Sequence, residues 1–91
     1  MARGARLKPN RLAEKLVRLR TALGLSQNDL IRELGVDLTQ NRISEYETGK
    51  GEPPLPVLLR YARVAGVCVE TLIDDDLDLP DKLPAKPKHR V

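Results

Sequence analysis

The stretch LSQNDLIRELGVDLTQNRISEYETG, residues 25–49, constrains the fold of this chain most strongly, because it contains two short helical patterns separated by a turn. Ser26 is a good helix N-cap, and Asp29 three residues later completes a weaker version of the capping box, in which Glu or Gln is the usual residue. The first of the two helices is therefore expected to begin at about Gln27. Gly35 ends it, because glycine readily adopts the left-handed conformation that closes a helix.

The second helical pattern follows the linker Val36–Leu38. Thr39 can cap this helix, and Gly49 can end it. The hydrophobic pattern inside it is short, because only Ile43 and Tyr46 are apolar residues at a helical spacing. The sequence thus predicts a helix with a narrow buried side and a wide polar surface.

At about 100° per residue, polar residues of the second helix form one continuous face. That face consists of Gln40, Asn41, Ser44, Glu45 and Thr48. Amides, hydroxyls and a carboxylate on an exposed helix can read the donor and acceptor patterns of base edges in the major groove. Taken alone, such a face more often means a solvated surface of a small helical bundle.

The segments LRTALGLSQNDL and TQNRISEYETG resemble the helix-turn-helix of the phage Cro and repressor family, also called the xenobiotic-response-element family of bacterial regulators. The resemblance covers residues 12–74 and depends on an ordered set of residues. The set is Arg20, Ser26, Gln27, Gln40, Ile43, Ser44 and Glu47–Gly49. It implies an all-α, five-helix repressor-like domain that reads DNA with the helix near residues 40–48.

The resemblance also implies roles for individual side chains. The residues implied to contact base edges are Gln40, Asn41, Ser44 and Glu45. The residues implied to contact phosphates, with the N-terminal arm, are Gln27, Arg42 and Lys50. In the family the glutamine at the place of Gln40 reads adenine, and the one at the place of Gln27 supports it. The arginine at the place of Arg20 pairs with the glutamate at the place of Glu47, which joins the first helix to the recognition helix.

Two features depart from the family pattern. Asp37 and Leu38 are an insertion in the turn, which can tilt the recognition helix or shift its start, although Leu38 can pack under the loop. Cys68 occupies a cap position where serine or threonine is commoner. We interpret Cys68 as a small substitute that tolerates burial, and not as a reactive thiol.

Three further helices are predicted outside this stretch. The first is capped by Asn10, ends at Gly24, and has the apolar stripe Leu12, Leu16, Leu19 and Leu23. The fourth begins by Pro56 and ends at Gly66, with the buried stripe Leu58, Tyr61, Ala62 and Ala65. The fifth runs from about Val69 to Asp74. We therefore divide the chain into a flexible basic arm at 1–9, a helix-turn-helix domain at 10–75 and an acidic, then basic, tail at 76–91.

Charge is distributed unevenly along the 91 residues, which carry a net charge of +3. Residues 1–20 contain seven Lys or Arg and one acid, whereas residues 70–81 contain six acids and no base. A basic arm fits contact with phosphates, but basic termini are also common solubilising tails. Leu77, Leu79 and Leu83 lie in or next to the acidic part, where they can fold back, contact a second chain, bind a protein partner or be solvated.

Several classes of function are disfavoured by composition. Cys68 and His89 are the single cysteine and histidine, so we expect neither a metal site nor a bound cofactor. The sequence has no histidine-supported nucleophile and no glycine-rich phosphate loop, so we do not expect an enzyme. No apolar run approaches the roughly 18 residues of a membrane span, so a cytoplasmic protein, nucleoid-associated when bound to DNA, is expected.

The interpretation that follows is a sequence-specific DNA-binding transcriptional regulator of the repressor type. We expect a homodimer on an inverted-repeat operator, built on the fourth and fifth helices and the tail leucines. The alternative is an antitoxin-like or adaptor protein that binds a protein partner through its C-terminal segment. Only the leucine-bearing acidic tail supports this alternative.

Overall fold

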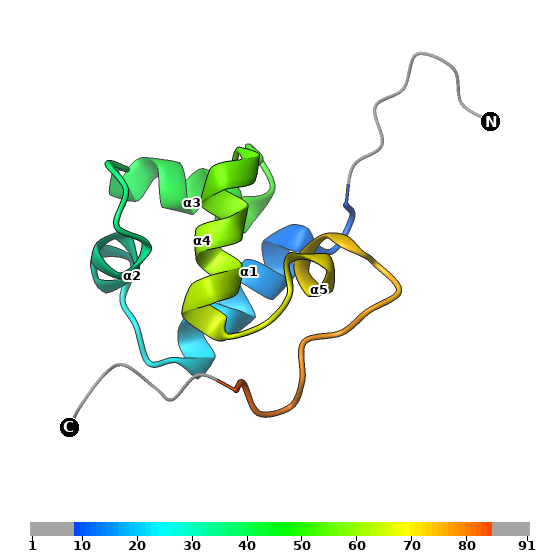
Figure 1. Ribbon diagram of the computed structural model, residues 1–91. Coiled ribbons are helices and arrows are strands. Elements are labelled where there is room, and N and C mark those ends of the chain that lie inside the picture. The colour runs from blue at the N-terminus through cyan, green and yellow to red at the C-terminus, as the bar shows by residue number, and fades with distance from the viewer. Residues whose placement is uncertain (1–8, 85–91) are drawn as a thin grey trace, which may run out of the picture.

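The structure is a computed structural model of the chain and describes residues 9–84. This described part contains five helices and no strand (Figure 1). The helices are α1 (Leu12–Ala22), α2 (Gln27–Leu34), α3 (Gln40–Thr48), α4 (Leu55–Ala65) and α5 (Val69–Ile73). The all-α, five-helix fold predicted from the sequence is therefore confirmed. No helix within the described range is long and apolar enough to cross a membrane.

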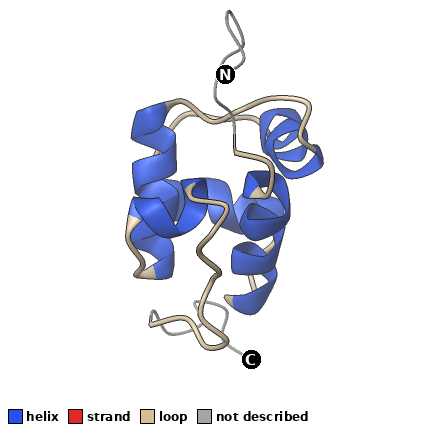
Figure 2. Ribbon diagram, turned by 90° about the vertical axis from the view of Figure 1, so that its right-hand side faces the viewer, coloured by secondary structure: helices blue, strands red, loops and turns tan. Residues whose placement is uncertain are grey.

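The helices enclose one apolar core. α1 contacts α3 and α5, α2 contacts α3 and α4, and α4 contacts α5. In Figure 1, α4 crosses the middle of the domain with α2 and α5 to either side, and Figure 2 shows the loops that join the helices. The buried core residues include every member of the two predicted stripes, on α1 and α4, together with Leu25, Leu30, Leu34, Ile43, Tyr46, Val57, Leu72 and Leu79.

Local capping fixes the ends of α2 and α3. The Ser26 hydroxyl accepts a hydrogen bond from the Asp29 N–H at 3.0 Å, and the Asp29 carboxylate accepts one from the Ser26 N–H at 3.3 Å. The Thr39 hydroxyl accepts a hydrogen bond from the Arg42 N–H at 3.2 Å. Gly49 ends α3 with a φ of 80°, a conformation that side chains disfavour. Both predicted caps are thus confirmed.

The predicted cap of the first helix is wrong. Arg11, and not Asn10, occupies the N-cap position of α1, and its side chain makes no cap hydrogen bond. The Asp75 carboxylate accepts hydrogen bonds from the Asn10 N–H at 2.9 Å and the Arg11 N–H at 3.0 Å. These donors favour the charged form and hold the pKa of the Asp75 carboxyl below its usual value. A residue after α5 therefore supplies the cap that the local sequence was expected to supply.

Lys15 makes the reciprocal contact from α1 to α5. Its side chain is buried, and its Nζ donates hydrogen bonds to the Thr71 carbonyl at 2.8 Å and the Asp74 carbonyl at 2.9 Å. Both carbonyls lie at the end of α5, where helical partners are missing. Burial lowers the pKa of Lys15. The sequence analysis did not single out Lys15, which lies beside Leu16 but was not part of the apolar stripe.

The segment after α5 passes along α1 and contributes to the core (Figure 1). Leu79 is buried and Leu83 packs against the core, so both leucines fold back on the domain, whereas Leu77 is exposed. The domain core thus includes residues from the segment that the sequence assigned to the tail. Cys68 occupies the N-cap of α5, as predicted, where it is exposed and makes no side-chain cap hydrogen bond. The arm before Pro9 and the tail from 85 to 91 lie outside the described residues.

Candidate nucleic-acid interface

The recognition helix α3 is held on one side and open on the other. Ile43 and Tyr46 are buried between α3 and the rest of the domain. Gln40, Asn41 and Thr48 of the predicted polar face are exposed, and Arg42 is exposed beside them. Ser44 and Glu45 are half-buried, and the side chain of Glu47 is almost entirely buried. α3 therefore presents amide, guanidinium and carboxylate groups from a backbone that its apolar side keeps in place.

α3 begins at the predicted residue, with the two residues of the insertion in the turn before it. Leu38 is partly buried and packs against the core, and its N–H donates to the Val36 carbonyl at 3.1 Å. This tight turn, together with the Thr39 cap, leaves Gln40 as the first residue of α3. The inserted residues are thus absorbed in the loop, and Gln40 lies beside the start of α2.

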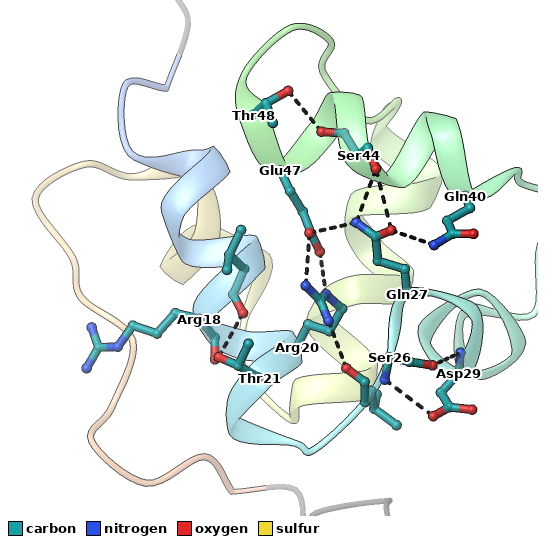
Figure 3. Close-up of polar contacts among 12 residues, drawn as sticks. Arg18, Arg20, Thr21, Ser26, Gln27, Asp29, Gln40, Ser44, Glu47 and Thr48 are labelled. Atoms are coloured by element: carbon teal, nitrogen blue, oxygen red, sulfur yellow. Dashed lines mark hydrogen bonds and ion pairs between the residues drawn. The ribbon is translucent and has the colours of Figure 1, made fainter.

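Arg20 and Glu47 join α1 to α3 through a bidentate ion pair (Figure 3). The Arg20 Nε donates to Glu47 Oε2 at 2.6 Å, and Nη2 donates to Oε1 at 3.1 Å. The third donor of the guanidinium, Nη1, bonds the Leu25 carbonyl at 2.9 Å. The side chains are 17% and 6% exposed, so the pair is largely shielded from water. Parallel guanidinium–carboxylate bonds of this kind are geometrically specific.

The Gln27 amide links this ion pair to the exposed end of α3 (Figure 3). Its Nε2 donates to Glu47 Oε1 at 3.1 Å and to the Ser44 hydroxyl at 3.2 Å. Its Oε1 accepts a hydrogen bond from Gln40 Nε2 at 3.1 Å. The structure thus brings together five residues that the sequence analysis assigned to three different roles.

A second ion pair lies on the outer surface of α3. Arg42 Nη1 donates to Glu45 Oε1 at 3.1 Å, between side chains that are 58% and 45% exposed. An exposed pair of this kind contributes only about 0.2–1 kcal/mol, so its members are free to exchange partners. Asn41 and Lys50 lie outside both groups as exposed residues, and the Lys50 N–H bonds the Glu45 carbonyl at 3.0 Å.

Sequence reasoning missed the contact between Ser44 and the buried network. Ser44 was assigned to the polar face, and Glu47 to the pair with Arg20. Their spacing of three residues already places them next to each other on α3, facing the preceding helix. Tyr61 lies near this network and is fully buried, and its hydroxyl has no hydrogen-bond partner among the described residues. Burial raises the pKa of the Tyr61 phenol.

Comparison with known proteins agrees with this geometry. A family model described as a helix-turn-helix domain matches residues 11–75, which is most of the chain. The chain is also similar to the SPbeta prophage-derived uncharacterized HTH-type transcriptional regulator YonR of Bacillus subtilis (strain 168). The two are 35% identical over 60 residues, which cover 66% of this chain and 54% of that relative. The chain thus spans about half the length of the curated relative it matches.

Proposed function

The chain belongs to the helix-turn-helix family of regulators of the Cro and repressor kind, and on this premise we propose that it is a sequence-specific DNA-binding transcriptional regulator that represses. The observation that carries the proposal is the orientation of α3. Its apolar side is anchored by Ile43 and Tyr46, and its free side exposes Gln40 and Asn41. Such a helix fits the major groove, where amides distinguish base pairs.

In this proposal Gln40, Asn41 and Glu45 contact base edges. Ser44 is half-buried and bonded to Gln27, so it lies at the margin of the reading surface. The Glu45 carboxylate can accept a hydrogen bond from the amino group of cytosine. Its pairing with Arg42 offsets the repulsion that a carboxylate meets near phosphates.

The proposed phosphate contacts flank the reading surface. Lys50 and Arg42 are exposed cations at the end and near the start of α3. Gln27, at the first position of α2, completes the set through its backbone N–H, because its side-chain NH₂ group bonds Glu47 and Ser44. Because bacterial DNA lies in the cytoplasm, the proposed function implies a cytoplasmic, nucleoid-associated protein without enzymatic activity.

We further propose that the protein acts as a homodimer on an inverted repeat. One short helix contacts only a few base pairs, so a single half-site discriminates poorly against a genome of competing sites. Exposed apolar residues suited to a symmetric contact are Leu55 at 75% and Leu59 at 42% on α4, with Ile73 on α5 and Leu77 beyond it. Leu55 and Leu59 are four residues apart and share one side of α4. Leu79 and Leu83 are used by the protomer's own core and leave this set.

DNase footprinting tests both proposals. The wild-type protein should protect two half-sites about 10 base pairs apart, with an affinity that falls steeply between two salt concentrations. The double variant Leu55→Asn with Leu59→Asn should protect one half-site, or neither, at the same concentration. Leu55→Met, which keeps an apolar side chain of similar volume, is the matched control. Protection of both half-sites by the double variant would refute the proposed dimer surface.

The alternative function is binding of a protein partner by the C-terminal segment. The exposed Leu77 between Asp76 and Asp78 favours it, because an isolated apolar side chain in an acidic segment can anchor a contact. A wild-type protein that shifts no DNA at low salt would favour this function over the first. Sequence-selective shifts by the wild type, lost in Gln40→Ala, would favour the DNA-binding function.

A further inference from the structure

We propose that Glu47 determines base specificity from inside the domain, as a positioning residue that acts through Gln27 on Gln40. The proposal rests on the proposed DNA-binding function and deepens it. It assigns the Arg20–Glu47 pair a second role besides stabilising the fold. The chain of contacts runs from the buried pair to the exposed start of α3 in two hydrogen bonds of 3.1 Å each.

Glu47 is the hydrogen-bond acceptor at the buried end of these contacts. Its carboxylate is bonded by two nitrogens of the Arg20 guanidinium, which cannot lose its proton in a protein. Both oxygens of the carboxylate thus accept hydrogen bonds from N–H groups, and Glu47 has no hydrogen to donate to Gln27. At 6% exposure, it has little access to water as an alternative partner.

The orientation of the Gln27 amide follows from its contact with Glu47. Because Glu47 only accepts, the NH₂ group of Gln27 must face it, as it does at 3.1 Å. The opposite orientation would place an amide oxygen against a carboxylate oxygen at that distance, without a hydrogen atom between them. Next to another amide or a hydroxyl group, which can both donate and accept, the Gln27 amide could take either orientation. The Glu47 carboxylate permits only one.

The orientation of the Gln27 amide determines in turn which atoms Gln40 presents to DNA. With Gln27 Oε1 facing it, Gln40 donates one hydrogen of its NH₂ group inward. The second hydrogen of that group and the Oε1 atom stay available on the exposed side. One donor beside one acceptor is the pattern that pairs with the N7 and amino group of adenine. The orientation of a buried carboxylate thereby fixes which base the exposed amide prefers.

Glu47→Gln is the decisive variant, because it keeps the shape and removes the charge. The new amide oxygen would keep the shorter bond, to Arg20 Nε at 2.6 Å, so the NH₂ group would take the place of Oε1, which Gln27 contacts. Gln27 would then turn its oxygen toward residue 47 and its NH₂ group toward Gln40. Gln40 would turn its own oxygen inward to accept that bond and would present mainly donors to DNA. We expect the preference for adenine over guanine at the base that Gln40 reads to fall about 10-fold or more.

Selection of binding sites from random DNA measures this preference at every position. Gln40→Ala identifies the base position that Gln40 reads. Gln27→Ala removes the hydrogen bonds that connect Glu47 to Gln40 and keeps the Arg20–Glu47 ion pair. Both Glu47→Gln and Gln27→Ala should lose preference at that same position and keep it elsewhere. Glu45→Gln is the matched control, since it makes the same chemical change on the same helix but outside the chain. Its effect should be confined to another position.

The Gln27 amide can also be followed without DNA. In the free ¹⁵N-labelled protein, its side-chain NH₂ signals should shift on Glu47→Gln and stay unchanged on Glu45→Gln. A merely structural role for Glu47 would weaken all base positions equally and leave the preference profile intact. Where Glu47→Gln does not fold, Gln27→Ala decides alone, and retention of the adenine preference by that variant overturns the proposal. A wild type that selects no sequence refutes the proposed function and this role together, whereas a selective wild type unaffected by both variants refutes this role alone.

Discussion

Two polar networks hold the ends of α1, and they are built differently. At its C-terminal end, Arg20 bonds the side chain of Glu47, and further side chains continue the chain to the surface of α3. At its N-terminal end, Asp75 and Lys15 bond mainly backbone groups: the Asp75 carboxylate accepts from N–H groups that begin α1, and Lys15 donates to carbonyls that end α5.

The two networks therefore differ in what they can do. The N-terminal network stabilises the fold, whereas the C-terminal network can also pass the orientation of one side chain on to the next. Every residue except proline has the same backbone N–H and carbonyl groups. The N-terminal network therefore fixes where the helices meet and sets no side-chain orientation. A side-chain amide has a donor end and an acceptor end, so a chain of amides carries an orientation from one residue to the next. We therefore expect variants at the two ends of α1 to differ in kind: loss of stability at one, and loss of stability with altered DNA preference at the other.

The largest effect on stability is expected from Glu47→Ala. It leaves the guanidinium of Arg20 shielded and without its carboxylate partner, a change that typically costs about 3–5 kcal/mol in buried pairs. Urea denaturation of Glu47→Ala, Arg20→Ala and the double variant measures the coupling. The double variant should be less destabilised than the sum of the two singles. Strictly additive changes would show that the pair is not coupled.

In the segment after α5, Leu79→Ala should cost about 2–3 kcal/mol, because Leu79 is 4% exposed and its truncation leaves a cavity in the core. Leu77→Ala is the matched control, two residues earlier and 42% exposed, and should change stability by less than about 0.5 kcal/mol. Both are read from urea denaturation curves. Binding-site selection by folded Leu79→Ala should match the wild type, and an altered base preference would erase the distinction between loss of stability and altered DNA preference.

The helix ends that the sequence predicted correctly are those controlled by neighbouring residues. The Ser26 and Thr39 caps each act within three residues, so their signal lies in one short stretch. The cap of α1 comes from Asp75, more than sixty residues away from Asn10 and Arg11, and no local pattern records such a contact. Asn10 was a plausible local cap that a distant carboxylate replaced.

Burial in the segment after α5 was unpredictable for a different reason. Leu77 and Leu79 are chemically identical and two residues apart, yet one is exposed and the other buried. Without a helix or strand there is no periodicity to assign them to faces. For the candidate site, the resemblance implied the residues, the Arg20–Glu47 pair and the support of Gln40 by Gln27, whereas the bonds of Gln27 to Glu47 and Ser44 could be seen only in the structure. The contacts of individual side chains with bases and phosphates stay predictions.

Within α3, base and phosphate contacts should separate in binding assays. Gln40→Ala should cost about 1–3 kcal/mol on the best site and relax preference at one position, and Glu45→Ala should do the same at another. Lys50→Ala should weaken all sequences alike and reduce the salt dependence of binding. Titrations at two salt concentrations on matched and mismatched sites make the comparison. None of these exposed residues should affect folding in the way that Glu47 does, and equal destabilisation by Gln40→Ala would contradict the assignment.

The smallest effect is expected from the charge of Asp75, and it depends on pH. Its pKa in the folded protein lies below the ordinary aspartate value of about 3.9, chiefly because the N–H groups of Asn10 and Arg11 bond the carboxylate. As the pH falls, the unfolded chain therefore takes up this proton before the folded protein does. The stabilisation is complete well above that ordinary value and is lost as the pH falls through the folded-state pKa.

Asp75→Asn should consequently be less stable than the wild type at pH 7, and the difference should shrink as the pH falls below about 4. An asparagine keeps an oxygen that can accept one of the N–H bonds, so the loss reflects the charge and the second bond. Asp76→Asn removes the same charge at an exposed neighbour and should leave the difference from wild type small at both pH values. Urea midpoints at pH 7 and pH 3 give the comparison. A penalty for Asp75→Asn that is as large at pH 3 as at pH 7 would mean that shape, and not charge, caps α1. The binding-site preference of Asp75→Asn should equal that of the wild type at neutral pH, because the bonds of Asp75 end on backbone groups and cannot reach the amide of Gln40.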